Sequence, residues 1–197
     1  MTYHILSALA AFAFVSSITP GPNNLMLMAS GANYGFARSI PHMLGIGIGF
    51  TVMVLLVGVG LMGVFDMFPP LYTILKVASV AYLLWLAWKI ANAGAPDGKT
   101  AGGTPFTFIQ AALFQWVNPK AWTMALTAIT LYAPDRSLWA VALVAGIFGI
   151  INLPSVSVWT LLGQQMRHIL NNPARLRLFN WSMSGLLVLS LYPVVLG

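Results

Sequence analysis

Cysteine and glutamate are missing from this sequence, and acidic residues as a class are scarce. The 197 residues contain three acidic side chains, which are Asp66, Asp97 and Asp135. Without cysteine the chain has no disulfide framework and no thiolate site for metal or redox chemistry. It also lacks paired carboxylates, GxSxG and P-loop motifs, and a cluster of His and acidic ligands. We therefore expect no enzyme activity, no cofactor and no metal.

Charge of either sign is rare. Soluble domains carry about 25% charged residues. Here 6% of the residues are charged and 59% are hydrophobic, and the mean hydropathy is +0.85. Such a chain cannot cover a water-facing surface, so the composition predicts an all-α integral membrane protein. The net charge of +6 does not indicate a nucleic-acid partner, because the nine basic residues are scattered between apolar runs.

Long apolar runs are what the sequence has instead of charge. Crossing the hydrocarbon takes about 20 apolar residues, and six transmembrane helices are predicted. Their ranges are His4–Ser30, Pro41–Phe65, Leu71–Ala91, Phe106–Ala133, Leu138–Leu162 and Leu178–Leu196. A single transmembrane domain over 1–197 is predicted, in two inverted three-helix repeats at about 1–92 and 105–197 with a linker at 93–104. In the second span, Gly45 and Gly49 predict the close approach of another helix.

Basic residues predict the orientation in the membrane. The loops after the first, third and fifth spans hold Arg38, Lys89, Lys99, Arg167, Arg175 and Arg177. The loops on the opposite side hold Arg136 beside Asp135. Since basic loops are retained in the cytoplasm, both termini are predicted to lie outside it.

Proline breaks the first and fourth spans at corresponding places. The residues at the breaks are Thr19, Pro20, Gly21, Pro22, Asn23 and Asn24, and Asn118 and Pro119. Paired broken helices in inverted repeats point to the binding site of a transporter. The start of the second half of a broken helix exposes N–H groups that attract an anion such as a carboxylate. For the first break taken alone, a structural kink with satisfied carbonyls is the alternative.

Ionisable and polar side chains at membrane depth are further candidates. Lys120 follows the second break, where a charge costs about 2.5 kcal/mol or more. No acidic residue is predicted at that depth, so we expect a substrate carboxylate to be its partner, with snorkelling to the interface as the alternative. His42 is a candidate for proton coupling, against a satisfied interfacial histidine. Asn152 is a polar position that could line the pathway.

Several motifs together resemble a known family. "TPGPNN" in the first span, "NYGFARS" before the second, "AYLLWLAWKI" ending the third and "QWVNPKAW" in the fourth are similar to the LysE/RhtB family of amino-acid exporters. Within that family the cysteine/O-acetylserine branch is the most similar. The resemblance implies proton-driven export of amino acids or close derivatives across the bacterial inner membrane. By matching position, residues 19–23 form the first broken-helix motif and residues 118–120 the second.

These observations predict a secondary transporter that exports neutral amino acids or derivatives of the cysteine, O-acetylserine, homoserine or threonine type. Neutral substrates are favoured because the membrane-depth acidic residues of lysine-exporting members have no match here. The expected partners are the amino-acid substrate, protons and the lipid bilayer, and a homo-oligomer is left open. Two alternatives stay open: a membrane enzyme acting on a lipid-linked phosphate, and a small membrane interaction subunit.

Overall fold

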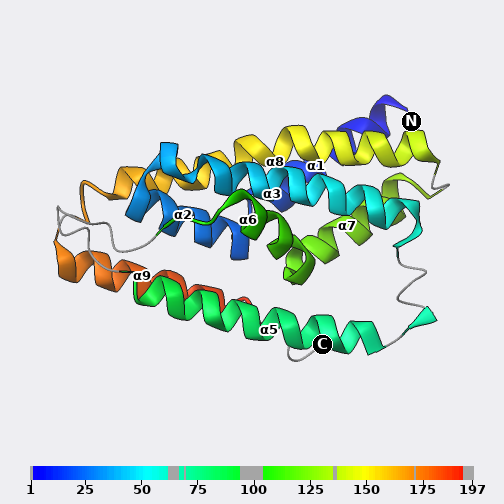
Figure 1. Cartoon of the computed structure of the whole chain (residues 1–197). Helices are drawn as coiled ribbons and strands as arrows, with labels where there is room; N and C mark the ends of the chain where they lie inside the picture. Colours follow the sequence, from blue (N-terminus) through cyan, green and yellow to red (C-terminus); the bar gives the residue numbers. More distant parts are fainter. Residues whose placement is uncertain are drawn as a thin grey trace.

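The computed structural model describes residues 2–61, 67–68, 70–93, 104–134, 137–170 and 172–192 (Figure 1). The helical elements are α1 (Tyr3–Ile18), α2 (Pro22–Tyr34), α3 (Phe36–Leu56), the π-helical η1 (Val57–Leu61), α5 (Pro70–Ala91), α6 (Phe108–Phe114), the 3-10 turn η2 (Gln115–Val117), α7 (Pro119–Tyr132), α8 (Leu138–Met166) and α9 (Pro173–Leu189). These ranges contain no strand, which confirms the predicted all-α class. Most of the predicted linker, and all three aspartates, lie outside the described residues.

Part of the predicted membrane topology can be recognised from helix length and composition. Three helical stretches, Phe36–Gly60, Pro70–Ala91 and Leu138–Met166, are long and apolar enough to cross a membrane. The pair α1 and α2 also qualifies when taken as one span bent by 53°. The described residues therefore provide three spans, or four with the bent pair, and the six-span arrangement stays a prediction.

The helices pack in two groups. In the larger group α8 contacts α1, α2, α3 and α7, and α3 also contacts α6. Its hydrophobic core includes Phe50, Ile129 and Phe148. In the smaller group α5 packs along α9, and Figure 1 shows this pair as a separate layer beneath the others. The pair reaches the larger group through contacts of α2 with both of its helices and of η2 with α5.

Glycines allow two pairs of helices to approach closely. Where α2 crosses α8, a Cβ at Gly31 would overlap the Thr160 carbonyl oxygen, and one at Gly163 would overlap that of Met28. Gly45 and Gly49 of α3 face the backbone of α6 in the same manner. The close helix approach predicted for Gly45 and Gly49 is therefore confirmed. These crossings hold the two broken segments, α1–α2 and α6–α7, against the long helices α8 and α3.

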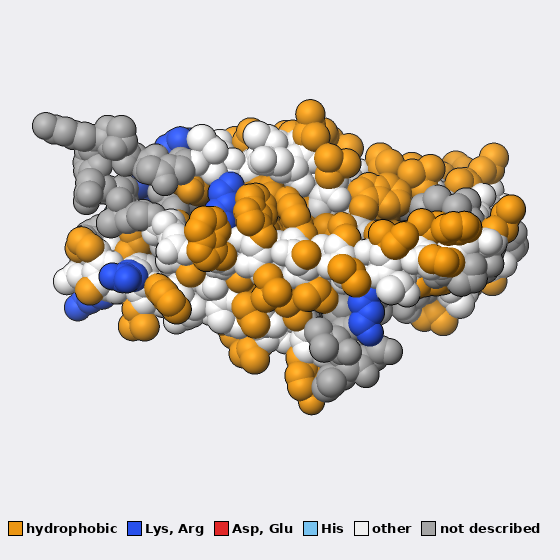
Figure 2. All heavy atoms as spheres, turned by 60° about the horizontal axis from the view of Figure 1, so that its bottom comes forward, with side chains coloured by type: hydrophobic (Ala, Val, Ile, Leu, Met, Phe, Trp, Pro, Cys, Tyr) orange, Lys and Arg blue, Asp and Glu red, His pale blue; other side chains and the backbone are white. Residues whose placement is uncertain are grey.

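The outer surface is suited to lipid. Figure 2 shows the face formed by the lower helices of Figure 1, and hydrophobic side chains cover most of it. Exposed hydrophobic residues of α5 and α9 include Ile74, Val77, Trp88, Leu178 and Leu189. An exposed apolar area of this extent would be unfavourable in water and is expected of a surface in contact with acyl chains.

Candidate functional site

The first break is a short extended segment between α1 and α2. α1 ends at Ile18, and both Thr19 and Gly21 have extended backbone angles. Pro22 then occupies the first turn of α2, where its missing N–H costs no helical hydrogen bond. The first N–H groups of α2 have no partner within the helix and carry partial positive charge. The break therefore presents hydrogen-bond donors from α2 and acceptors from α1.

Side chains satisfy the carbonyl groups at the end of α1. The Asn24 amide donates to the carbonyl oxygens of Ser17 and Thr19, both at 2.8 Å. The indole N–H of Trp159 donates to the Ile18 carbonyl oxygen at 2.9 Å. In the absence of a solute the acceptor side of the break is therefore already occupied, as the kink alternative requires.

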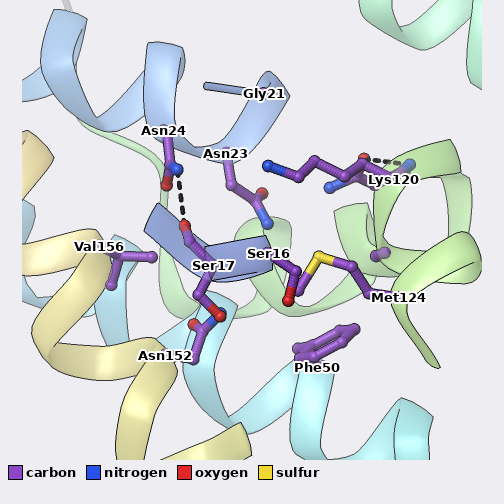
Figure 3. A pocket seen from close by; sticks show the side chains of 12 residues that line it. Ser16, Ser17, Gly21, Asn23, Asn24, Phe50, Lys120, Met124, Asn152 and Val156 are labelled. Carbon is purple, nitrogen blue, oxygen red and sulfur yellow. Dashed lines mark hydrogen bonds between the residues drawn. The ribbon is translucent and has the colours of Figure 1, made fainter. Parts of the chain in front are cut away.

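Lys120 extends from the second break toward Gly21 and Asn23 of the first (Figure 3), and its ammonium group hydrogen-bonds to the residues at the end of α1. Its Nζ donates to the Thr19 carbonyl oxygen at 2.7 Å, to the Thr19 hydroxyl at 2.9 Å and to the Pro20 carbonyl oxygen at 3.2 Å. Its stem passes so close to Gly21 that a Cβ there would lie 2.6 Å from Lys120 Cδ. These hydrogen bonds were not predicted from the sequence, and the substrate carboxylate as counter-ion of Lys120 stays a prediction. In the structure the partially negative carbonyl end of α1 is the partner of Lys120.

The second break has the same construction as the first. Asn118 is extended, with φ −93° and ψ 108°, and separates η2 from α7. Its side-chain oxygen accepts from the backbone N–H of Lys120 at 3.2 Å and so caps α7. Pro119 occupies the first turn of α7. Each break therefore ends in a new helix whose N-terminus starts with proline.

An amide pair joins the two breaks. The Asn23 Nδ2 donates to Gln115 Oε1 at 2.9 Å, and Gln115 Nε2 donates back to Asn23 Oδ1 at 3.2 Å. Gln115 is fully buried, whereas Asn23 is half-buried and also lines the cavity described below. Gln115 was not among the site residues predicted from the sequence. The available signal was a glutamine three positions before Asn118, within an apolar span.

A small polar cavity lies between the breaks (Figure 3). Of the residues predicted from the sequence, Gly21, Asn23, Asn24, Asn118 and Lys120 line it. The other predicted break residues lie in the adjoining turns: Thr19 and Pro20 bind Lys120, while Pro22 and Pro119 begin α2 and α7. The cavity volume is about 20 Å³, which is room for about one water molecule. An amino acid could enter only after the helices around the cavity move apart.

Residues of α1, α3, α7 and α8 complete the lining. Asn152 lines the cavity, as expected, and its Nδ2 donates to the Ser17 hydroxyl at 3.4 Å. Asn152 Oδ1 is buried and has no hydrogen-bond partner among the described residues. Phe50, Met124 and Val156 form an apolar part of the wall that the sequence did not predict. Nothing in their spacing separates them from ordinary helix-packing residues.

The chemistry of the lining suits a small zwitterion with an uncharged side chain. Two helix N-termini and the Lys120 ammonium group supply positive charge, which favours a carboxylate. The unpartnered Asn152 oxygen can accept from an ammonium group. No acidic side chain lines the cavity among the described residues. Those residues also contain no group of three or more potential metal ligands.

His42 lies away from this cavity. It lines a second one, between the end of α2, the start of α3 and the end of α5. Its side chain is 1% exposed, and neither ring nitrogen has a hydrogen-bond partner in the part of the chain that the structure describes. The alternative of a satisfied interfacial histidine is therefore wrong. The proton-coupling role of His42 stays a prediction.

Comparison with known proteins gives relatives whose names refer to efflux. The chain is 35% identical to a cysteine/O-acetylserine efflux protein of Salmonella typhimurium over 134 residues, 67% of each chain. It is 30% identical to the cysteine/O-acetylserine efflux protein of Escherichia coli K12 over 181 residues, 89% of this chain and 90% of the relative. No solved structure matches.

The family assignment follows from the extent of the similarity. The model of the LysE type translocators matches residues 14–191, a range that includes both breaks and every described residue of the cavity lining. The members of this family are transporters, and the apolar helices agree with a multi-pass protein of the inner membrane. A chain matched over nearly its whole length, with two broken helices around a polar cavity, belongs to the family of LysE type translocators.

Proposed function

We propose that this protein is a secondary transporter that exports small neutral amino acids or their close derivatives across the inner membrane, coupled to protons. The observation that carries the proposal is the polar cavity between two broken helices, lined by Asn23, Asn118 and Lys120. The names of the relatives support cysteine and O-acetylserine as members of the substrate class. The translocator family argues against the enzyme alternative.

The proposed binding mode assigns each end of the substrate to one part of the lining. The carboxylate lies at the N-termini of α2 and α7 and receives a hydrogen bond from Lys120. The ammonium group donates to Asn152 Oδ1, which otherwise lacks a partner. The side chain of the substrate packs against Phe50 and Met124. A small uncharged side chain fits this wall, whereas a second ammonium group would be buried without a counter-ion.

Pairwise contacts support the inverted repeat that this mechanism needs. The proposed six spans are α1–α2, α3–η1, α5, α6–α7, α8 and α9. In an inverted repeat, α1–α2 corresponds to α6–α7 and α8 corresponds to α3. Contacts of α1–α2 with α8 should therefore be matched by contacts of α6–α7 with α3, and both sets are present. The pairs α3 with α8 and α5 with α9 map onto themselves.

In the proposed cycle Lys120 exchanges one set of oxygen partners for another. Without substrate it holds the end of α1 against the start of α7, through Thr19 and Pro20. A substrate carboxylate competes for the same ammonium donors and so loosens the link between the two repeats. Such a differential contact is what allows a ligand to shift the balance between two conformations.

Export by purified protein tests the proposed function. Proteoliposomes are loaded separately with radiolabelled cysteine, O-acetylserine, homoserine, threonine, leucine or lysine, and efflux is followed with and without a pH gradient. We expect efflux of small neutral members that the gradient accelerates, and none of lysine. Well-folded protein that transports no member of this panel would refute the proposal and favour the interaction-subunit alternative.

The orientation can be tested independently. We propose that both termini face away from the cytoplasm, which places residue 99 inside and residue 135 outside. Periplasmic alkaline phosphatase and cytoplasmic fluorescent protein are fused at each position. Only the fluorescent reporter should be active at Lys99 and only the phosphatase at Asp135. The same reporter being active at both positions would contradict the alternating spans.

A further inference from the structure

The second cavity lies at the end of the molecule where α2 ends and α3 begins. It has a volume of about 50 Å³, more than the central cavity and enough for a few water molecules. Its polar lining includes Ser30, Asn33, His42 and Lys89. Under the proposed orientation this is the cytoplasmic end, from which a substrate for export must arrive.

The electrostatics of this cavity favour an anionic group beside a hydrogen-bond acceptor. Lys89 Nζ lies over the rings of Trp85 and Phe106, at 5.3 Å and 5.2 Å from their centroids. No ion pair or hydrogen bond to Lys89 exists among the described residues, and no described acidic side chain lines the cavity. Two further described cations lie nearby and add positive charge: Arg38, 5.6 Å over the Tyr34 ring, and Arg167, whose guanidinium group lies beside Gly35. A ligand carboxylate would give Lys89 the ionic partner that the described residues do not provide.

His42 supplies the second part of the site. Its ring packs against the Phe106 ring, with centroids 5.2 Å apart. Both ring nitrogens are buried without partners, which is unusual for groups that are costly to leave unsatisfied. A neutral imidazole has one acceptor nitrogen, and an ammonium group of a ligand could donate to it. A carboxylate on Lys89 and an ammonium group on His42 together describe an α-amino acid.

One face of α2 connects this cavity with the central one. Asn23 lines the central cavity, while Met26, Ser30 and Asn33 line the second. These positions follow one another at three- and four-residue spacing, so they lie on the same side of the helix. Asn33 is held in place by Asn180, which accepts from Asn33 Nδ2 at 3.1 Å. The face of α2 that begins at the first break therefore ends at the second cavity.

We propose that the second cavity is a separate binding site for a small zwitterionic amino acid, in which Lys89 binds the carboxylate and His42 accepts from the ammonium group. It receives substrate on the cytoplasmic side before the central cavity opens. The inference rests on the proposed function for the identity of the ligand. It adds a second site, and with it a prediction about stoichiometry that the central cavity alone does not make.

Equilibrium binding of radiolabelled L-cysteine to the purified full chain, kept under reducing conditions, tests the inference. We expect wild type to bind about two molecules per chain, and Lys89→Gln and Lys120→Ala about one each, because each variant loses one charged hydrogen bond. Lys76→Gln, an exposed lysine on the same helix α5, is the matched control and should bind like wild type. Lys89→Arg keeps the charge and should retain most of the binding.

Transport measurements supply a second readout. In Lys89→Gln the internal concentration giving half-maximal export should rise about tenfold, the size expected for one charged hydrogen bond, with the maximal rate unchanged. A single binding event in wild type, lost in Lys120→Ala and untouched in Lys89→Gln, would overturn the second site and leave the proposed function standing. Absence of any binding to well-folded wild type would overturn both.

Discussion

Replacing Lys120 by alanine is expected to abolish export while the protein still accumulates in the membrane. The substitution removes three hydrogen bonds to Thr19 and Pro20 and, in the proposed complex, the charged anchor of the substrate carboxylate. A hydrogen bond to a charged group contributes about 1.5–3 kcal/mol, so losing the carboxylate contact alone should lower the transport rate at low substrate by about ten- to a hundredfold. The measurement is radiolabelled efflux from proteoliposomes containing equal amounts of wild type and variant.

Lys76→Ala is the matched control for this experiment. Lys76 is also a lysine within an apolar helix, but it is exposed and lies outside the cavity lining. The control should export like wild type. Normal export by Lys120→Ala would show that the carboxylate is held elsewhere, and the contact between Lys120 and α1 would then be structural.

Replacing Gly31 by valine is expected to prevent stable folding. Any Cβ at Gly31 meets the carbonyl oxygen of Thr160, so the helices α2 and α8 could no longer cross at their present distance. Overpacking of a core commonly costs about 1–3 kcal/mol, and a contact with rigid backbone belongs at or above the top of that range. The measurement is the yield of monodisperse protein in mild detergent, with thermal unfolding of whatever is recovered.

Gly146→Ala serves as the matched control because it adds a methyl group to α8, where nothing lies within 4 Å of the new Cβ. Its yield and melting temperature should stay near those of wild type. If Gly31→Val gave the wild-type yield and melting temperature, the close crossing of α2 and α8 would not be a requirement of the fold.

The sequence was sufficient to locate both breaks because proline acts locally. Pro22 and Pro119 begin new helices since proline suits the first turn of a helix and disrupts its interior. The close packing at Gly45 and Gly49 was also predictable, because small residues four apart form a flat strip on one face of a helix. These signals depend on neighbours in the chain and not on the tertiary structure.

The partners of the polar groups could not be predicted. Asn23 and Gln115 are 92 positions apart in the chain, and their pairing depends on how the two broken segments meet. The hydrogen bonds of Lys120 to the carbonyl groups of Thr19 and Pro20 could not be predicted either, because these residues are about 100 positions away in the chain. The complete burial of His42 likewise results from the rings and helices packed around it.

The bonds between Lys120 and the end of α1 also bear on when such a carrier works. In the proposed binding mode a substrate carboxylate must displace the hydrogen bonds that Lys120 already makes to Thr19 and Pro20. The apparent affinity for substrate is therefore lower than the new contacts alone would give. Weak substrate binding is a useful property for an exporter of metabolites that the cell needs. Under the proposed binding mode we expect the carrier to stay mostly empty at ordinary substrate concentrations and to export only an excess. The hydrogen bonds at the first break would then set the substrate concentration at which export begins.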